Sequence, residues 1–167
     1  AAVFCLEKGK KSDALGVIEG VGFATEPLTH NISISADAHC FQRSMRMALD
    51  GMNPEEIDVI VTHAPGTLKG DSSELLAIEK VFKNHQPALT SNKWIIGHTL
   101  GASGATSLEM AILMMREQEF VGVPFLTGQK APKRCSRHGD REFPPRRDAL
   151  PRPGLPPPIQ YVWGWLP

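Results

Sequence analysis

Residues Thr90 to Met115 decide the fold: Thr90-Ser-Asn-Lys93-Trp-Ile-Ile-Gly97-His98-Thr-Leu-Gly101-Ala-Ser-Gly104-Ala-Thr-Ser-Leu-Glu-Met-Ala-Ile-Leu-Met-Met115. A polar start with Lys93 leads into a loop spaced by Gly97, Gly101 and Gly104, and the loop opens into a helix that is apolar on nearly every face. A helix of this kind is usually buried. We therefore expect a buried central helix, with His98 and Lys93 beside its N-terminal N–H groups and the positive end of its dipole.

Strand and helix patterns alternate on either side of this stretch. Apolar or alternating runs predict strands at 1–6, 17–23, 57–62, 88–91 and 121–127. Within the second run, Gly20 and Gly22 indicate a close backbone approach or a bulge. Helical spacing begins at Ala38, with Gly51 expected as its C-cap, and again at the capping box Asp71-Ser-Ser-Glu74. Such alternation predicts an α/β layered fold with a largely buried sheet.

Composition narrows the functional class. The chain has 167 residues, one domain's worth, with 41% hydrophobic and 22% charged residues and no net charge. This balance gives no electrostatic case for nucleic acid or an anionic membrane. No apolar run reaches the length of a membrane span, and no signal-peptide pattern precedes one. Three widely spaced cysteines are expected to be reduced thiols, so we expect a cytoplasmic protein.

The composition changes abruptly near residue 130. Residues 131–167 hold one lysine and six arginines against three acidic residues, a net charge of +4, and nine of the fourteen prolines. We therefore divide the chain into a domain at 1–130 and an Arg/Pro-rich tail at 131–167. The tail is interpreted as disordered, as a shifted reading frame, or as a polyproline ligand at Pro156–Pro158.

Three side chains are candidates for chemistry. His63 follows the β-branched run 57–62, and ligands of open α/β sheets bind where strands end; a purely structural histidine fits there equally well. His98 lies in the glycine-spaced loop, and Lys93, five residues earlier, is by default a solvated lysine. No His-x-x-x-His pair supports a metal site, and no Gly-x-Gly-x-x-Gly or Gly-Lys-Ser/Thr supports a nucleotide site. Asp71 and Glu74 are interpreted as helix caps.

Two segments resemble the β-ketoacyl-acyl-carrier-protein synthases, condensing enzymes of the thiolase fold. Residues 63–74 are similar to the family pattern His-Gly-Thr-Gly-Thr-x-x-Gly-Asp-x-x-Glu, and residues 91–105 to Ser-x-Lys-x-x-x-Gly-His-x-x-Gly-Ala-x-Gly-Ala. The resemblance covers about residues 1–128 and corresponds to the C-terminal half of such an enzyme. It implies a mixed sheet with a buried central helix.

The resemblance also implies a chemistry. His63, His98 and Lys93 take the places of the catalytic histidines and lysine, and Gly66 and Thr67 those that contact phosphopantetheine. The family decarboxylates malonyl-carrier protein and joins it to an acyl group held on a cysteine. The implied partners are acyl carrier protein, a missing N-terminal half and, in a homodimer, a second copy of the chain. No cofactor or metal is implied, and the paired histidines resemble the elongating branch.

Three departures from the family pattern qualify this prediction. No cysteine, neither Cys5, Cys40 nor Cys135, matches the family's nucleophile. Ala64-Pro65 replaces the family's Gly-Thr and removes a hydroxyl and a backbone N–H. The tail replaces the strand that should close the site. Two hypotheses follow: the chain supplies the His/His/Lys half of a condensing site, or it is a non-catalytic fragment or partner-binding module.

Overall fold

The computed structural model describes residues 1–8, 14–27, 35–125 and 136–137. The helices are α1 (His39–Leu49), α2 (Leu68–Phe82), α3 (Lys93–Ile96) and α4 (Ser103–Glu117), with the short 3-10 helices η2 (Pro54–Glu56) and η3 (Leu100–Ala102). The strands are β1 (Val59–Val61), β2 (Ala88–Thr90), β3 (Glu119–Phe120) and β4 (Ser136–Arg137). No helix in these described ranges is long and apolar enough to cross a membrane.

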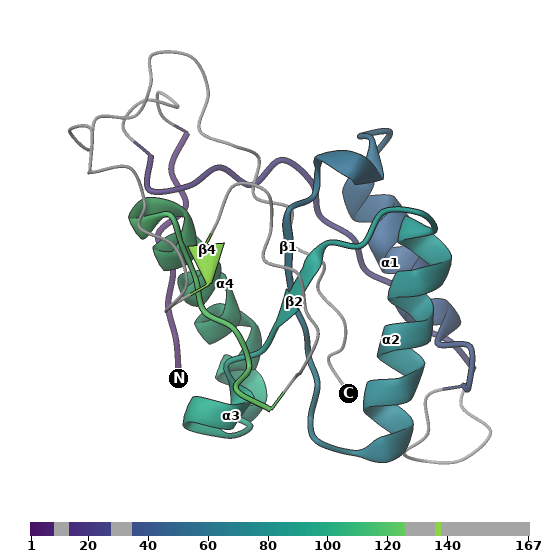
Figure 1. The fold of residues 1–167 in the computed structure, drawn as a ribbon. Helices are drawn as coiled ribbons and strands as arrows, with labels where there is room; N and C mark the ends of the chain where they lie inside the picture. The colour runs from purple at the N-terminus through teal and green to yellow at the C-terminus, as the bar shows by residue number, and fades with distance from the viewer. Residues whose placement is uncertain (9–13, 28–34, 126–135, 138–167) are drawn as a thin grey trace.

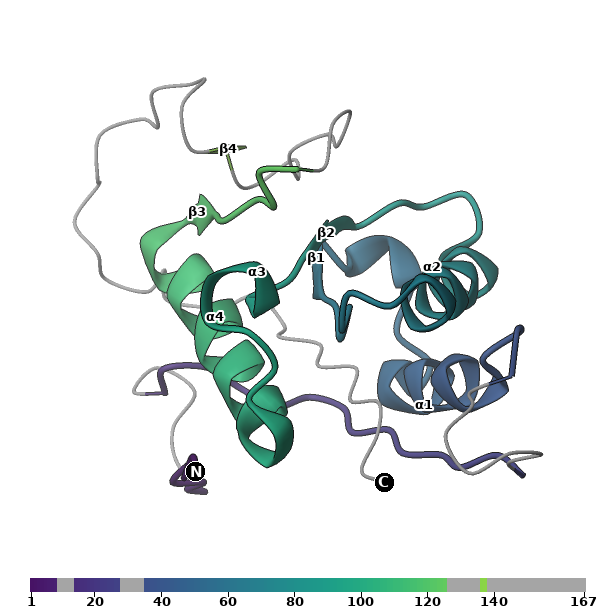
Figure 2. The same ribbon diagram turned by 90° about the horizontal axis from the view of Figure 1, so that it is seen from below.

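The strands β1 and β2 form the centre of the molecule, with helices on both sides (Figures 1 and 2). They pair in parallel, Ile60 opposite Leu89, and α2 is the crossover between them. Ile60 and Leu89 pack into a cluster with α1 and α2, whereas Val59, Val61 and Ala88 pack toward Met114 of α4. Alternate residues of each strand thus cover opposite faces. The predicted α/β class is confirmed.

Two details of the predicted core are not confirmed by the described residues. Helix α4 is not a buried central helix: only Ser103, Ser107 and Met114 are buried, because the described part of the chain covers it from the β1 and β3 side alone. The sheet is not mixed in the described residues, since both strand pairs, β1–β2 and β3–β4, are parallel.

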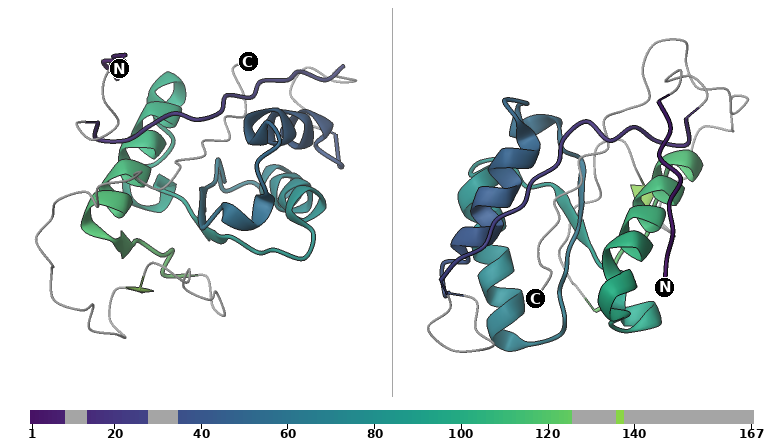
Figure 3. Two further views of the ribbon diagram at one scale, coloured as in Figure 1. Left: turned by 90° about the horizontal axis from the view of Figure 1, so that it is seen from above. Right: turned by 180° about the vertical axis from the view of Figure 1, so that it is seen from behind.

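The N-terminal segments are extended but are not the strands predicted at 1–6 and 17–23. Residue Ile18 forms a single β-bridge, and the remaining described residues before α1 form no ladder. Instead, the later part of the segment 14–27, from Gly20 to Glu26, runs along α1 (Figure 3). A Cβ on Gly20 would lie 1.8 Å from the Ala48 carbonyl oxygen, and one on Gly22 1.8 Å from that of Ser44. The predicted close backbone approach is confirmed, and its partner is a helix.

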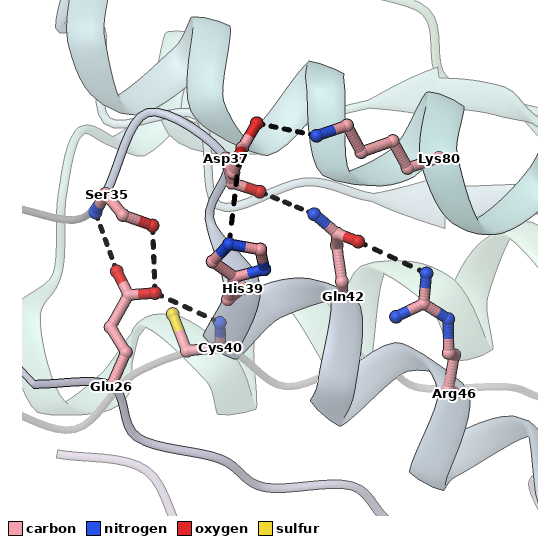
Figure 4. A network of polar contacts seen from close by, with 8 residues as sticks. All are labelled: Glu26, Ser35, Asp37, His39, Cys40, Gln42, Arg46 and Lys80. Carbon is pink, nitrogen blue, oxygen red and sulfur yellow. Dashed lines mark hydrogen bonds and ion pairs between the residues drawn. The ribbon is translucent and has the colours of Figure 1, made fainter.

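A polar network fixes the start of α1 (Figure 4). Ala38, the N-cap, has no side-chain cap of its own. The Glu26 carboxylate replaces it by accepting from the Cys40 N–H, at 3.3 Å, and from the Ser35 N–H and hydroxyl, at 2.6 and 2.9 Å. Asp37 then joins α1 to α2 through an ion pair with Lys80 of 2.6 Å. His39, Gln42 and Arg46 extend the network along α1.

Several predicted element ends shift. The C-cap of α1 is Asp50, in the left-handed region at φ 40°, one residue before the expected Gly51. The strand that follows α4 is β3, which ends at Phe120, so the predicted strand at 121–127 is wrong over 121–125, and 126–127 lie outside the described residues. Apart from Ser136 and Arg137 the tail, Cys135 included, also lies outside them, so the predictions made for it are not tested.

Candidate active site

His63 stands just beyond β1, where the strand pairing ends. The Thr62 N–H still donates to the Thr90 carbonyl, at 2.7 Å. The next two backbone N–H groups, of His63 and Ala64, donate to the two carboxylate oxygens of Glu74, at 2.7 and 2.8 Å. Glu74 is buried on α2, and charged acceptors of this kind make strong hydrogen bonds. The carboxylate therefore fixes the backbone that carries His63.

This contact corrects the predicted capping box. Helix α2 begins at Leu68, and its N-cap is Thr67, whose hydroxyl accepts from the Gly70 N–H at 3.2 Å. Asp71 accepts from the Gly66 N–H, at 3.2 Å. Asp71 and Glu74 therefore bind the turn that precedes the helix and do not cap a helix that starts at Asp71.

His98 lies close to His63, although 35 positions separate them in the chain. Their ring centroids are 5.0 Å apart, with the planes at 81°. The Leu100 N–H donates to Nδ1 of His98 at 3.0 Å, so a neutral His98 carries its proton on Nε2. The His98 side chain is exposed, whereas that of His63 is half-buried. The arrangement brings together two imidazoles predicted from sequence to share a site.

The charges around the pair favour neutral imidazole at His63. Burial first, and then the electrostatic influence of Lys93 and His98, lowers the pKa of His63 to about 4 against the opposing effect of Asp71. At neutral pH, His63 therefore offers an N–H donor without a positive charge.

Lys93 is the first residue of α3, and its field reaches the His63 ring. Burial lowers the pKa of Lys93, while Glu74 and Asp71 oppose the shift. Burial also raises the pKa of Glu74, against its bonds from Ala64 and His63 and the charge of Lys93. Lys93, Glu74 and Asp71 thus form a partly buried group of interacting charges, and this group acts on His63.

The remaining predicted site residues have separate roles. Gly66 is exposed, at φ 85°, and forms the turn before α2. The hydroxyl of Thr67 is engaged as the N-cap, although it keeps a proton to donate. Gly97, at φ 70°, ends α3, and its N–H donates to the Lys93 carbonyl at 2.8 Å. Gly101 lies in η3 and Gly104 in the first turn of α4, neither with a positive φ.

Neither described cysteine suits the role of nucleophile. Cys5 is exposed in an extended segment, and Cys40 is buried on α1. Burial, and then the charge of Glu26, raises the pKa of Cys40, which disfavours the thiolate. The described residues also hold no cluster of three or more His, Cys, Asp or Glu side chains able to bind a metal ion.

Sequence reasoning missed Glu74 as a site residue. The sequence did contain a signal for it. Glu74 lies eleven positions after a histidine at a strand end, with one turn between them, so its carboxylate can bind the backbone at that histidine. Two buried polar residues, Ser91 and Asn92, were also missed; they precede Lys93 and hold α3 in place.

The structure thus combines a parallel βαβ core, which is an α/β arrangement, with two neighbouring imidazoles at the end of β1. The family described as beta-ketoacyl synthase, C-terminal domain, matches residues 15–124. The chain therefore belongs to the beta-ketoacyl synthase family, as the two sequence motifs predicted.

Curated relatives are much longer than this chain. The chloroplastic 3-oxoacyl-[acyl-carrier-protein] synthase I of Hordeum vulgare is 39% identical over 108 residues, 59% of this chain and 22% of the relative. The 3-oxoacyl-[acyl-carrier-protein] synthase homolog of Saccharomyces cerevisiae is 32% identical over 122 residues, 68% of this chain and 28% of the relative. The chain thus spans less than a third of the length of these proteins.

Two solved structures share the fold. The ishigamide ketosynthase/chain length factor has a TM-score of 0.57 and 26% identity, over 72% of this chain and 29% of that one. A type II polyketide acyl-carrier protein in complex with its ketosynthase, bound to the hexaketide, has a TM-score of 0.53 and 26% identity, over 59% of this chain and 25% of that one.

Proposed function

We propose that this chain supplies the decarboxylating part of a β-ketoacyl synthase site, in a thiolase-like layered fold, for fatty acid or polyketide synthesis. The observation that carries the proposal is the pair His63 and His98, whose rings lie 5.0 Å apart at the end of β1. Family membership and relatives named as 3-oxoacyl-acyl-carrier-protein synthases support it.

The proposed reaction begins with a malonyl thioester on the phosphopantetheine of acyl carrier protein. The bond between its α-carbon and carboxylate breaks, carbon dioxide leaves, and the electron pair delocalises onto the thioester oxygen as an enolate. Two neutral N–H donors aimed at that oxygen would stabilise the developing charge, and removing one such donor costs roughly 10²–10³ in rate at comparable sites. The described geometry fits this role, since His98 presents its Nε2–H and His63 stays uncharged.

The other residues of the site have supporting roles in the proposal. Lys93 tunes the imidazoles electrostatically, and Glu74 fixes the backbone of His63. Gly66 and Thr67 lie on the same turn and would meet the pantetheine arm, with no further cofactor needed. Ala64 and Pro65 reduce the hydrogen-bonding capacity there, because proline has no N–H.

Condensation needs more than these residues. The enolate carbon must attack an acyl thioester on a cysteine, and the cysteine sulfur then leaves as the new carbon–carbon bond forms. Since neither Cys5 nor Cys40 suits that role, the thiol would come from a further part of the synthase. Acyl carrier protein and, in a homodimer, a second copy of the chain would be the other partners.

The second candidate function is a non-catalytic fragment or partner-binding module in which His63, Lys93 and His98 no longer act. It is favoured by the buried, high-pKa thiol of Cys40 and by the exposed position of His98.

A decarboxylation assay separates the two functions. Malonyl-acyl carrier protein labelled in its free carboxylate is incubated with the chain, and labelled carbon dioxide is collected. The first function predicts release that falls about a hundredfold or more in His98→Ala, with His85→Ala, a histidine bound to the Ile57 carbonyl at the far end of α2, as the matched control. No release, or equal release from His98→Ala, would favour the second.

A further inference from the structure

Helix α3 is not held in place by its own packing. It has only four residues, and three of them, Trp94, Ile95 and Ile96, are 42–55% exposed. A single helical turn is unstable in isolation, because its nucleation fixes several residues for one hydrogen bond. Lys93, the first residue of this turn, must therefore be held by contacts outside α3.

The side chain of Asn92 makes such a contact. Asn92 is 4% exposed and precedes α3 as its N-cap residue, yet its side chain does not cap the helix. Its Nδ2 donates to the Thr106 hydroxyl on α4, at 3.2 Å. That hydroxyl donates its one proton to the Ser103 carbonyl, at 2.9 Å, so it must accept from Asn92, and the orientation of the amide is fixed.

The backbone of Asn92 binds α3. Its carbonyl accepts from the N–H groups of Ile95 and Ile96, at 3.0 and 3.1 Å. One residue therefore binds the first turn of α3 through its carbonyl and the first turn of α4 through its amide. The loop closed by the contact between Asn92 and Thr106 carries both Lys93 and His98.

Packing alone does not explain why residue 92 is an asparagine. The Oδ1 of Asn92 is buried and makes no hydrogen bond within the described residues, and the same holds for the hydroxyls of Thr99 and Ser103. A buried acceptor without a partner makes the amide less stabilising than an apolar side chain of the same shape. The presence of an amide here is thus better explained by its hydrogen bond to Thr106 than by a gain in the stability of the fold.

We propose that Asn92 is a positioning residue for Lys93, acting through its hydrogen bond to Thr106. The bond keeps Lys93 where its charge interacts with Glu74 and Asp71 of α2 and with His63. The importance of this placement for decarboxylation rests on the proposed function, whereas the placement itself does not.

The test measures Lys93 without turnover. The chain is trace-labelled with acetic anhydride across a range of pH, and the labelling of each lysine is read by peptide mass spectrometry, with exposed Lys83 as internal reference. In Thr106→Val, which removes only the hydroxyl, the labelling midpoint of Lys93 should shift upward, because the released side chain is better solvated. Thr106→Ser, which keeps the hydroxyl, should match the wild type, and Lys83 should be unchanged throughout.

Two results would overturn the proposal: an unchanged Lys93 midpoint in Thr106→Val, or a shift in Thr106→Ser as large as that in Thr106→Val. Thr106→Ala is judged by the same outcomes if Thr106→Val loses helix content. A shifted midpoint without carbon dioxide release contradicts only the proposed function. Release with an unshifted midpoint contradicts only the positioning role.

Discussion

Ala64 holds a backbone conformation that alanine rarely adopts. Its φ is 31°, on the left-handed side, where the Cβ of an L-residue approaches its own backbone. The residue follows His63, and its N–H is held by Glu74, so the turn is imposed by the site. Glycine occupies this position in the family pattern that residues 63–74 resemble.

Ala64→Gly should therefore stabilise the chain. Relief of roughly 1–2 kcal/mol of steric cost exceeds the roughly 0.5–1 kcal/mol of added chain entropy, which leaves a gain of about 0.5–1 kcal/mol. Urea unfolding measures it. Ala111→Gly, in the middle of α4, is the matched control and should lose about 1 kcal/mol. Equal losses in both variants would show that the φ of Ala64 carries no strain.

His63 should remain neutral well below neutral pH. Burial, aided by Lys93 and His98, lowers its pKa from 6.5 to about 4, and proton NMR of the imidazole measures this directly. The unfolded chain binds the proton near pH 6.5 and the folded chain only near 4. This contribution to stability is thus fully present above pH 6.5 and is lost as the pH falls to about 4, by at most about 3 kcal/mol.

Comparison with His63→Gln isolates this contribution. Glu74, whose pKa is raised, changes stability in the opposite sense over an overlapping range, but it is present in both proteins. The wild type should lose more stability than His63→Gln between pH 6.5 and 4. Parallel curves, or an NMR pKa near 6.5, would contradict the burial of His63.

The sequence predicted some residues of the candidate site and missed others. His63, Lys93 and His98 could be assigned to one site because their motifs lie in the same order and spacing as those of the family. Glu74 could not, because an acid three positions after an acceptor is also the pattern of a capping box. Only the fold shows that α2 begins at Leu68, so that Glu74 is free to bind the loop.

At the scale of elements, the contact between residues 14–27 and α1 depends on glycine. In Gly22→Ala the new Cβ would overlap the Ser44 carbonyl oxygen, which belongs to a helix backbone and cannot move aside alone. The segment should detach or shift, at a cost of about 2–3 kcal/mol. Gly101→Ala, which meets nothing within 4 Å, should change stability little.

Urea unfolding and limited proteolysis measure both variants. Gly22→Ala should unfold at lower urea and expose residues 14–27 to cleavage. A Gly22→Ala protein as stable and as resistant as Gly101→Ala would mean that the segment does not lie on α1.

Elements were predictable where their own residues determine them. The helix over α1 and the β-branched run of β1 both appeared as expected. The N-terminal runs have the alternating pattern of strands, but their described residues form no ladder. A ladder needs a neighbouring strand to pair with, and the pattern of one segment does not show whether such a strand is present. The all-round apolar surface of α4 likewise predicted burial, but burial requires covering elements that the described residues provide on one side only.

At the scale of the whole molecule, apolar side chains are exposed around the site and along the N-terminal segments. Trp94, Ile95, Ile96 and Leu100 lie next to His98 in sequence, and Val21 and Phe23 lie on the segment along α1. Exposed apolar surface of this extent favours association with other chains. We expect the isolated chain to self-associate and to have a low free energy of unfolding.

Sedimentation velocity and calorimetry test this expectation. Aspartate substitutions at Ile95 and Leu100 should reduce association, whereas Lys69→Asp, on the exposed first turn of α2, should not. A monodisperse monomer with a sharp, cooperative thermal transition would contradict it.

The central claim is that His63 and His98 act together on one malonyl thioester. The most direct test is the rate of carbon dioxide release from malonyl-acyl carrier protein in His63→Gln, His98→Gln and the double variant. Residues that act as a unit are strongly non-additive. Each single variant should release carbon dioxide about a hundredfold or more slowly than the wild type, and the double variant should be hardly slower than either. Losses that multiply in the double variant, or release that both single variants leave intact, would contradict this claim.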